Sequence, residues 1–286
     1  MCNISGLIEL ILFADDTSVF MSHHDIITLQ NNFNTEFAKL VDWLNNNKLV
    51  LNIKKTNFMT FTRKHIDATL IKIKIKDSFI EQVKQTTFLG VTIDNKLTWN
   101  EHTSVICNKI AKRIGLFYKL KSFPKETLMI LYNTLILPHL YYCILTWACS
   151  SMQNTNRLLV LQKKIIRVVY HSQYLAHTLP IFLNLKTLRM PDIYVYQCAI
   201  FMYLCNNKLL PTSIISYFQL NKNIHEHQTR SSNHFHFPLT KTSTYQNTIF
   251  YKGPLIWNGL PIAIRQSRTL SGFKRKMKCY LLQKYS

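Results

Sequence analysis

The chain has 286 residues, of which 47% are hydrophobic, so it can bury a core and is not a largely disordered protein. Its net charge is +21, and residues 127–286 hold 18 basic side chains against two acidic ones, Asp192 and Glu226. Such a surplus favours a polyanionic partner, nucleic acid first and an anionic membrane second.

The first feature along the chain is a predicted β-hairpin with two carboxylates at its tip. Apolar runs over 8–13 and 17–21 flank the sequence Phe-Ala-Asp-Asp, which places Asp15 and Asp16 in or beside a tight turn. Adjacent carboxylates repel each other, and a hard divalent cation would relieve that repulsion because it takes carboxylate oxygen. The alternative is an ordinary turn, since aspartate favours turns without any function.

A helix and a basic loop follow the hairpin. Asp25 is expected to cap a helix that runs to Leu44, because apolar side chains recur there at helical spacing. The loop over 51–56 reads Leu-Asn-Ile-Lys-Lys-Thr and leads into a short strand at 57–61. Its Lys55 is a candidate anion contact, and the alternative is a solvated lysine.

Residues 71–94 have the pattern of strands. Isoleucine and lysine alternate over 71–76, which predicts a half-buried strand with a basic outer face. Further strands are expected over 79–83 and 87–94, the second containing Phe-Leu-Gly at 88–90. The glycine there would let another backbone come close.

From residue 101 the pattern becomes helical. Two amphipathic segments, 101–120 and 157–170, carry basic side chains beside or opposite their apolar stripes, which indicates either phosphate contacts or simply solvated faces. The uncharged stretch 128–149 is long enough to span a membrane, but Asn133, Thr134 and Pro138 interrupt it, so a membrane span is not favoured.

The last third is less regular. A helix is expected over 192–204, a polar loop over 221–243, a turn-rich clasp with a buried Trp257, and a basic closing helix over 270–285. Four histidines in the loop (His225, His227, His234 and His236) lie near Cys198 and Cys205 in the sequence. Their spacing does not match a zinc knuckle, so a metal site there is not favoured.

Three of these motifs, in this order, resemble the reverse transcriptases (RNA-directed DNA polymerases) of non-LTR, LINE-type retrotransposons. Phe-Ala-Asp-Asp at 13–16 is similar to the palm hairpin that holds catalytic magnesium. The helix end Trp-Leu at 43–44, followed by Leu-Asn-x-x-Lys-Thr at 51–56, is similar to the next palm motif. Phe-Leu-Gly at 88–90 is similar to the primer-grip strand, and Gly-Pro-x-x-Trp-Asn-x-Leu-Pro at 253–261 resembles the C-terminal end of such reading frames.

The resemblance implies an α+β fold. It implies a partial antiparallel palm sheet with a packed helix over 1–98, a mostly helical thumb-like region over 99–172 and a basic C-terminal region over 173–286. Mg²⁺ is the implied cofactor, and RNA and DNA are the implied partners. The residues that the resemblance assigns are the metal ligands Asp15 and Asp16, Lys55 near the leaving pyrophosphate, Phe88, Leu89 and Gly90 at the primer, and Lys109, Lys112, Arg113, Lys163, Lys164 and Arg167 on nucleic acid.

The chain also departs from the family. Fingers, the upstream palm motifs, the first metal-binding Asp and an endonuclease domain are not found in it. We therefore expect a C-terminal fragment that is inactive alone and that would need the missing N-terminal polymerase segments as partners. The alternatives are a non-catalytic basic RNA- or DNA-binding module and, less favoured, a membrane-associated helical protein.

The cysteines and the N-terminus bear on the compartment. The chain has seven cysteines and no C-x-x-C pair, which indicates reduced thiols. No signal peptide is recognisable at the N-terminus. We expect an intracellular protein, in the nucleus or the cytoplasm.

Overall fold

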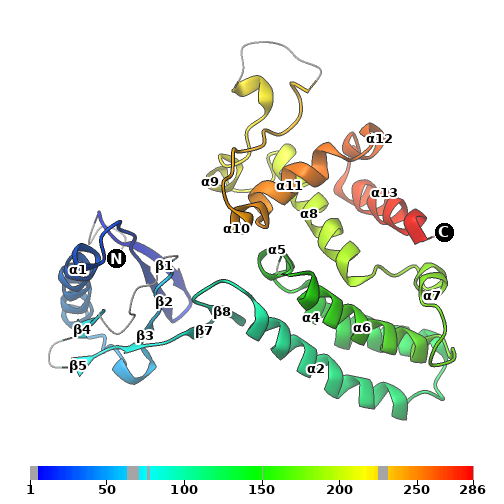
Figure 1. Cartoon of the computed structure of the whole chain (residues 1–286), viewed down its shortest axis with the longest axis horizontal. Coiled ribbons are helices and arrows are strands. Elements are labelled where there is room, and N and C mark those ends of the chain that lie inside the picture. Colours follow the sequence, from blue (N-terminus) through cyan, green and yellow to red (C-terminus); the bar gives the residue numbers. More distant parts are fainter. Residues whose placement is uncertain (1–5, 63–70, 76–77, 150, 225–230, 286) are drawn as a thin grey trace. The chain divides into compact units, whose positions relative to one another are not determined.

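The computed structural model describes residues 6–62, 71–75, 78–149, 151–224 and 231–285. The chain divides into two compact units, Met1–Leu97 and Thr98–Ser286, each with its own core (Figure 1). The first combines short strands with one long helix, and the second is helical, which confirms the α+β class.

The strands of the first unit pair two by two. Its elements are β1 Glu9–Phe13, β2 Asp16–Phe20, α1 Ile26–Asn46, the 3₁₀ turn η1 Ile53–Lys55, β3 Asn57–Phe58, β4 Lys74–Ile75, β5 Ser78–Phe79, β6 Glu81–Gln82, β7 Gln85–Phe88 and β8 Val91–Asp94. The described strands form the pairs β1–β2, β3–β6, β4–β5 and β7–β8, and β3–β6 is parallel. A single antiparallel sheet was the wrong expectation, because side-chain periodicity determines which face a strand buries but not which strand it pairs with.

Helix α1 packs where the sequence predicts. The Asp25 carboxylate accepts a hydrogen bond from the Thr28 N–H at 2.7 Å, which confirms the cap. The apolar face of α1 lies on the buried isoleucines of 71–80, and the intervening lysines, Lys72 and Lys74, point to solvent. Side-chain amides of α1 bond the backbone of this segment: Gln30 accepts from the Lys72 N–H at 2.8 Å and Asn34 from the Lys74 N–H at 3.1 Å. These amides satisfy one backbone donor within β4 and one just before it.

The predicted strand over 87–94 is a hairpin. Leu89, with φ 46°, and Gly90, with φ 76°, form its two-residue turn, and Phe88 pairs with Val91 across it. Positive φ at both central positions is the requirement of the turn type that best matches strand twist. The glycine signal therefore marks a change of direction within the predicted strand.

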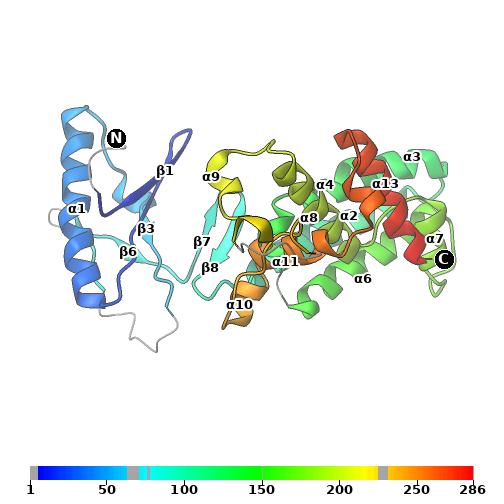
Figure 2. The same ribbon diagram turned by 90° about the horizontal axis from the view of Figure 1, so that it is seen from above.

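The helices of the second unit share one core. They are α2 Asn100–Lys119, α3 Lys125–Leu131, the π-helical segment η3 Tyr132–Ile136, α4 Leu137–Tyr141, α5 Ile144–Trp147, α6 Met152–Val169, α7 Leu179–Asn184, α8 Met190–Asn206, α9 Thr212–Ile215, η4 Asn221–Asn223, α10 Ser243–Gln246, α11 Ile249–Asn258, α12 Ile262–Arg265, α13 Leu270–Leu282 and η5 Gln283–Tyr285. Helix α8 is central and contacts α4, α5, α6, α11 and α13 (Figures 1 and 2). The predicted regions 99–172 and 173–286 thus pack around common apolar residues, and their division into thumb and C-terminal region stays a prediction.

The uncharged stretch is broken as its sequence predicts. A π-helical segment runs directly into α4, and Pro138 lies in the first turn of α4. Cys143 then adopts φ 48° and separates α4 from α5. Within the described residues, none of the helices has both the length and the apolar character that crossing a bilayer requires.

The predicted turn-rich clasp is a helix instead. Gly253 and Pro254 lie inside α11, and Trp257 is buried, with 2% of its surface exposed. A Cβ added to Gly253 would come within 2.7 Å of the Met202 sulfur, so the glycine permits α11 to pack closely on α8. This contact, rather than a turn, explains the glycine.

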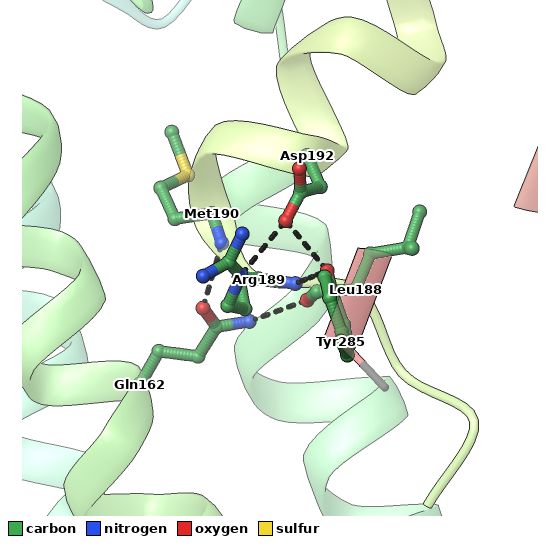
Figure 3. Close-up of polar contacts among 6 residues, drawn as sticks. All are labelled: Gln162, Leu188, Arg189, Met190, Asp192 and Tyr285. Carbon is green, nitrogen blue, oxygen red and sulfur yellow. Dashed lines mark hydrogen bonds and ion pairs between the residues drawn. The ribbon is translucent and has the colours of Figure 1, made fainter. Parts of the chain in front are cut away.

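A buried polar cluster joins the C-terminus to the start of α8 (Figure 3). The Tyr285 hydroxyl donates to the Asp192 carboxylate at 2.6 Å and accepts from the Arg189 N–H at 3.0 Å, and Arg189 also pairs with Asp192 at 2.9 Å. Beside them, the Gln162 amide donates to the Leu188 carbonyl and accepts from the Met190 N–H. Burial raises the pKa of Tyr285, so its hydroxyl remains a donor.

Replacing Tyr285 by Phe should lower the free energy of unfolding by about 1–3 kcal/mol, because the change leaves a buried carboxylate with one donor fewer. Urea unfolding of the second unit measures this loss. Tyr280→Phe is the matched control, since the Tyr280 ring lies under Lys284 and its hydroxyl makes no hydrogen bond within the described residues. Equal effects of the two substitutions would contradict the assigned role of the cluster.

Candidate carboxylate turn and basic surfaces

The hairpin of β1 and β2 places both aspartates at its tip. Ala14, with φ 51°, and Asp15 form the turn, and Asp16 is the first residue of β2, opposite Phe13. Positive φ at the first turn position is typical of two-residue hairpins. Both carboxylates are exposed, and within the described residues neither forms an ion pair.

The hairpin also exposes apolar side chains. Leu10 and Val19 pair on one face and pack toward the core of the first unit. On the opposite face, Ile11, Phe13 and Phe20 are between 42% and 58% exposed. The carboxylates therefore lie at the end of an unusually apolar exposed surface.

These two carboxylates do not make a complete metal site by themselves. Carboxylate oxygen is the donor that Mg²⁺ prefers. Within the described residues, however, no group of three histidine, cysteine, aspartate or glutamate side chains comes together. The residues present fit the chemistry of Mg²⁺ but do not supply the number of ligands that a catalytic metal centre needs. The histidines of the polar loop do not change this, and His225 and His227 lie outside the described residues.

Lys55 and the Phe-Leu-Gly segment belong to the same unit. Lys55 is the last residue of η1, and its backbone N–H donates a hydrogen bond to the Asn52 side chain at 3.3 Å. The side chain of Lys55 is exposed. Phe88, Leu89 and Gly90 form the tip of the β7–β8 hairpin, with Gly90 exposed. Their roles near pyrophosphate and primer stay predictions.

Helix α2 carries the first of the two predicted sets of basic side chains. Lys109 and Lys112 are exposed and Arg113 is half-buried. Burial lowers the pKa of His139 on α4, and the positive charges of Arg113 and Lys109 lower it further. At neutral pH this surface therefore carries the charges of the lysines and the arginine without that of the histidine.

Helix α6 presents the second group, around a groove. Lys163, Lys164 and Arg167 line a groove of about 270 Å³, together with Val160, Tyr174 and Leu175. The Arg167 guanidinium donates to the Ala176 carbonyl at 2.9 Å, which holds it beside the segment that follows the helix. Tyr174 is 67% exposed and offers an aromatic face among the cations. Sequence reasoning missed Tyr174 because it lies outside the periodic helix.

A third basic surface covers α13. Phe273, Met277 and Leu281 face the core, and four exposed cations lie between them along the helix: Lys274, Arg275, Lys276 and Lys278. The closing basic helix was predicted, but no role was assigned to it. The helical spacing of its apolar residues is the sequence signal that could have identified the exposed basic face of this helix.

Comparison with known proteins identifies relatives of one kind. Over 181 residues, 61% of this chain and 20% of the relative, the chain is 24% identical to the probable RNA-directed DNA polymerase from transposon BS of Drosophila melanogaster. Over 184 residues, 63% of the chain and 20% of the relative, it is 21% identical to the RNA-directed DNA polymerase from mobile element jockey of the same species. The chain is a relative of the RNA-directed DNA polymerases of non-LTR retrotransposons.

The chain spans about a fifth of the length of the RNA-directed DNA polymerases that it matches. No protein-family model matches it, and no solved structure matches it. The resemblance of its ordered motifs to such polymerases agrees with these relatives.

Proposed function

We propose that this chain is a part of a retrotransposon reverse transcriptase that holds RNA or DNA by its phosphates and does not polymerise by itself. In this proposal the first unit is part of the palm. Asp15 and Asp16 supply metal ligands that act only with further carboxylates, and Lys55 lies near the pyrophosphate. The second unit contains the thumb and contacts nucleic acid through its basic helices.

The observation that carries the proposal is the location of the acidic groups. Residues 127–286 contain two of them, and Glu226 lies outside the described residues. The other, Asp192, is 8% exposed and is held by Arg189 and Tyr285. Among the described residues of this region, no exposed carboxylate offsets the surface cations, and such a surface binds phosphate backbones through counterion release.

The α6 groove offers the sharpest test. Replacing Lys163, Lys164 and Arg167 together by Gln should weaken binding of a labelled RNA–DNA duplex by roughly tenfold to a hundredfold at 100 mM salt, because up to three phosphate contacts are lost. Fluorescence anisotropy with the whole chain measures the affinity.

The matched control replaces three exposed lysines elsewhere in the second unit, Lys208, Lys222 and Lys241, by Gln. It removes the same net charge without touching the groove. A loss of affinity within about threefold is expected, since only the long-range field changes. If both triple variants weaken binding equally, net charge and not the α6 groove accounts for it.

A further inference from the structure

A small pocket in the second unit brings together two lysines that are far apart in the sequence. Lys186 lies in the turn after α7, and Lys278 lies on α13. They line a cavity of about 180 Å³ together with Asn133, Tyr141 and Tyr196 from η3, α4 and α8. The pocket is separate from the α6 groove, with which it shares no lining residue.

The turn that carries Lys186 is closed by backbone bonds. The Lys186 N–H donates to the Leu183 carbonyl at 2.9 Å and the Thr187 N–H donates to the Phe182 carbonyl at 3.0 Å, which is the pattern that ends a helix with a left-handed residue. Lys186 has φ 49°, in agreement with that pattern. Its side chain therefore starts from a fixed backbone position at the pocket.

The polar groups of the pocket are hydrogen-bond donors. Within the described residues, the side chains of Asn133, Lys186 and Lys278 form no hydrogen bond or ion pair, so their N–H groups are available. Burial raises the pKa of Tyr141 to about 12 and also raises the pKa of Tyr196, so both hydroxyls stay protonated at neutral pH. No carboxylate is among the residues that line the cavity. Two ammonium groups with neutral donors around them suit an anion rich in acceptor oxygens.

We propose that this pocket binds a terminal phosphate of a nucleic-acid strand. A terminal phosphomonoester carries a charge of about −1.5 to −2 and three acceptor oxygens, whereas an internal phosphodiester has one charge and two free oxygens. Two lysines therefore match the terminal group better. The inference rests on the proposed function, because it assumes that the second unit binds nucleic acid.

The test compares one single-stranded oligonucleotide with a 5′-phosphate, a 3′-phosphate or hydroxyls at both ends, labelled internally. The whole chain should bind at least one phosphorylated form about tenfold more tightly than the hydroxyl form, because the terminal group adds charge-assisted hydrogen bonds. The double variant with Lys186→Gln and Lys278→Gln should lose this preference and bind all three oligonucleotides alike, whatever general affinity it loses with the charge on α13. The control with Lys208→Gln and Lys222→Gln removes the same charge and should keep the preference.

The outcomes separate the two proposals. Equal binding of all three oligonucleotides by the native chain overturns the pocket assignment and leaves the proposed function standing. A preference that persists in the Lys186 and Lys278 variant overturns it as well. Absence of binding to every oligonucleotide at low salt overturns the proposed function. In that case protection against thermal unfolding by a nucleoside 5′-monophosphate, lost in the double variant, would support a site for free phosphate esters, and its absence would overturn the pocket too.

Discussion

No primer extension is expected when the purified chain is incubated with primer–template, nucleotides and Mg²⁺. Phosphoryl transfer by two metal ions requires carboxylates that converge on ions about 4 Å apart. The tip of the β1–β2 hairpin supplies Asp15 and Asp16 only, and no third ligand joins them within the described residues. Magnesium should therefore bind weakly, through these two side chains and water.

The remaining acid of the hairpin cannot complete the site. Glu9 lies at the far end of β1, opposite Phe20, whereas Asp16 is opposite Phe13. The four residue-to-residue steps from Glu9 to Phe13 span about 13 Å at the usual strand rise. In α1, Glu36 pairs with Lys39 at 2.7 Å and so has a cation already.

A radiolabelled primer assay, with a complete reverse transcriptase as the positive control, measures the extension. The Asp15→Ala variant is the comparison that matters if any product forms. Extension by the native chain that disappears in Asp15→Ala would mean that the ligand set is complete, and it would refute the proposed inactivity. Extension that survives the substitution would indicate a contaminating polymerase.

A steep dependence on salt is the second large expected effect. The whole chain should bind a labelled RNA or DNA with little sequence preference, and its affinity should fall by roughly 10³-fold or more between 50 and 200 mM salt if about six phosphates are contacted. The reason is that basic side chains greatly outnumber acidic ones in residues 127–286. Asp192, the acidic side chain of this region that the structure describes, is buried in the polar cluster.

Anisotropy titrations at several salt concentrations give the slope directly. The Lys163, Lys164 and Arg167 variant should lower that slope by up to about three units, because fewer counterions are released. A flat response to salt, or no binding at 50 mM, would contradict a phosphate-based interface. A strong preference for one sequence would indicate that base contacts, and not the backbone, supply the affinity.

Local patterns determined much of the fold. The alternation of isoleucine and lysine over 71–75 correctly separated buried from exposed side chains, and Asp25 caps α1 as predicted. The helix over 192–204 and the buried Trp257 are also confirmed. These features depend on neighbours within a few residues, through hydrogen bonds and side-chain period, so the sequence expresses them directly. The order of the motifs likewise pointed to the family in which the relatives were found.

Long-range contacts decided the rest. Strand partners, including the parallel pair β3–β6, depend on which edges meet, and a period of two residues carries no such information. Gly253 reads as a turn residue, yet it lies in α11, where the missing Cβ leaves room for the Met202 sulfur of α8.

For the candidate functional surfaces, too, the sequence determined some properties and the tertiary structure determined others. Composition alone determined that the chain is basic. Packing, however, buries Asp192. As a result, no acidic side chain is exposed among the described residues after position 126. Packing also brings Lys186 and Lys278 to one pocket and sets Tyr174 beside the α6 groove. Such meetings of distant residues result from the shared core of the helices, whose three-dimensional arrangement no local pattern encodes.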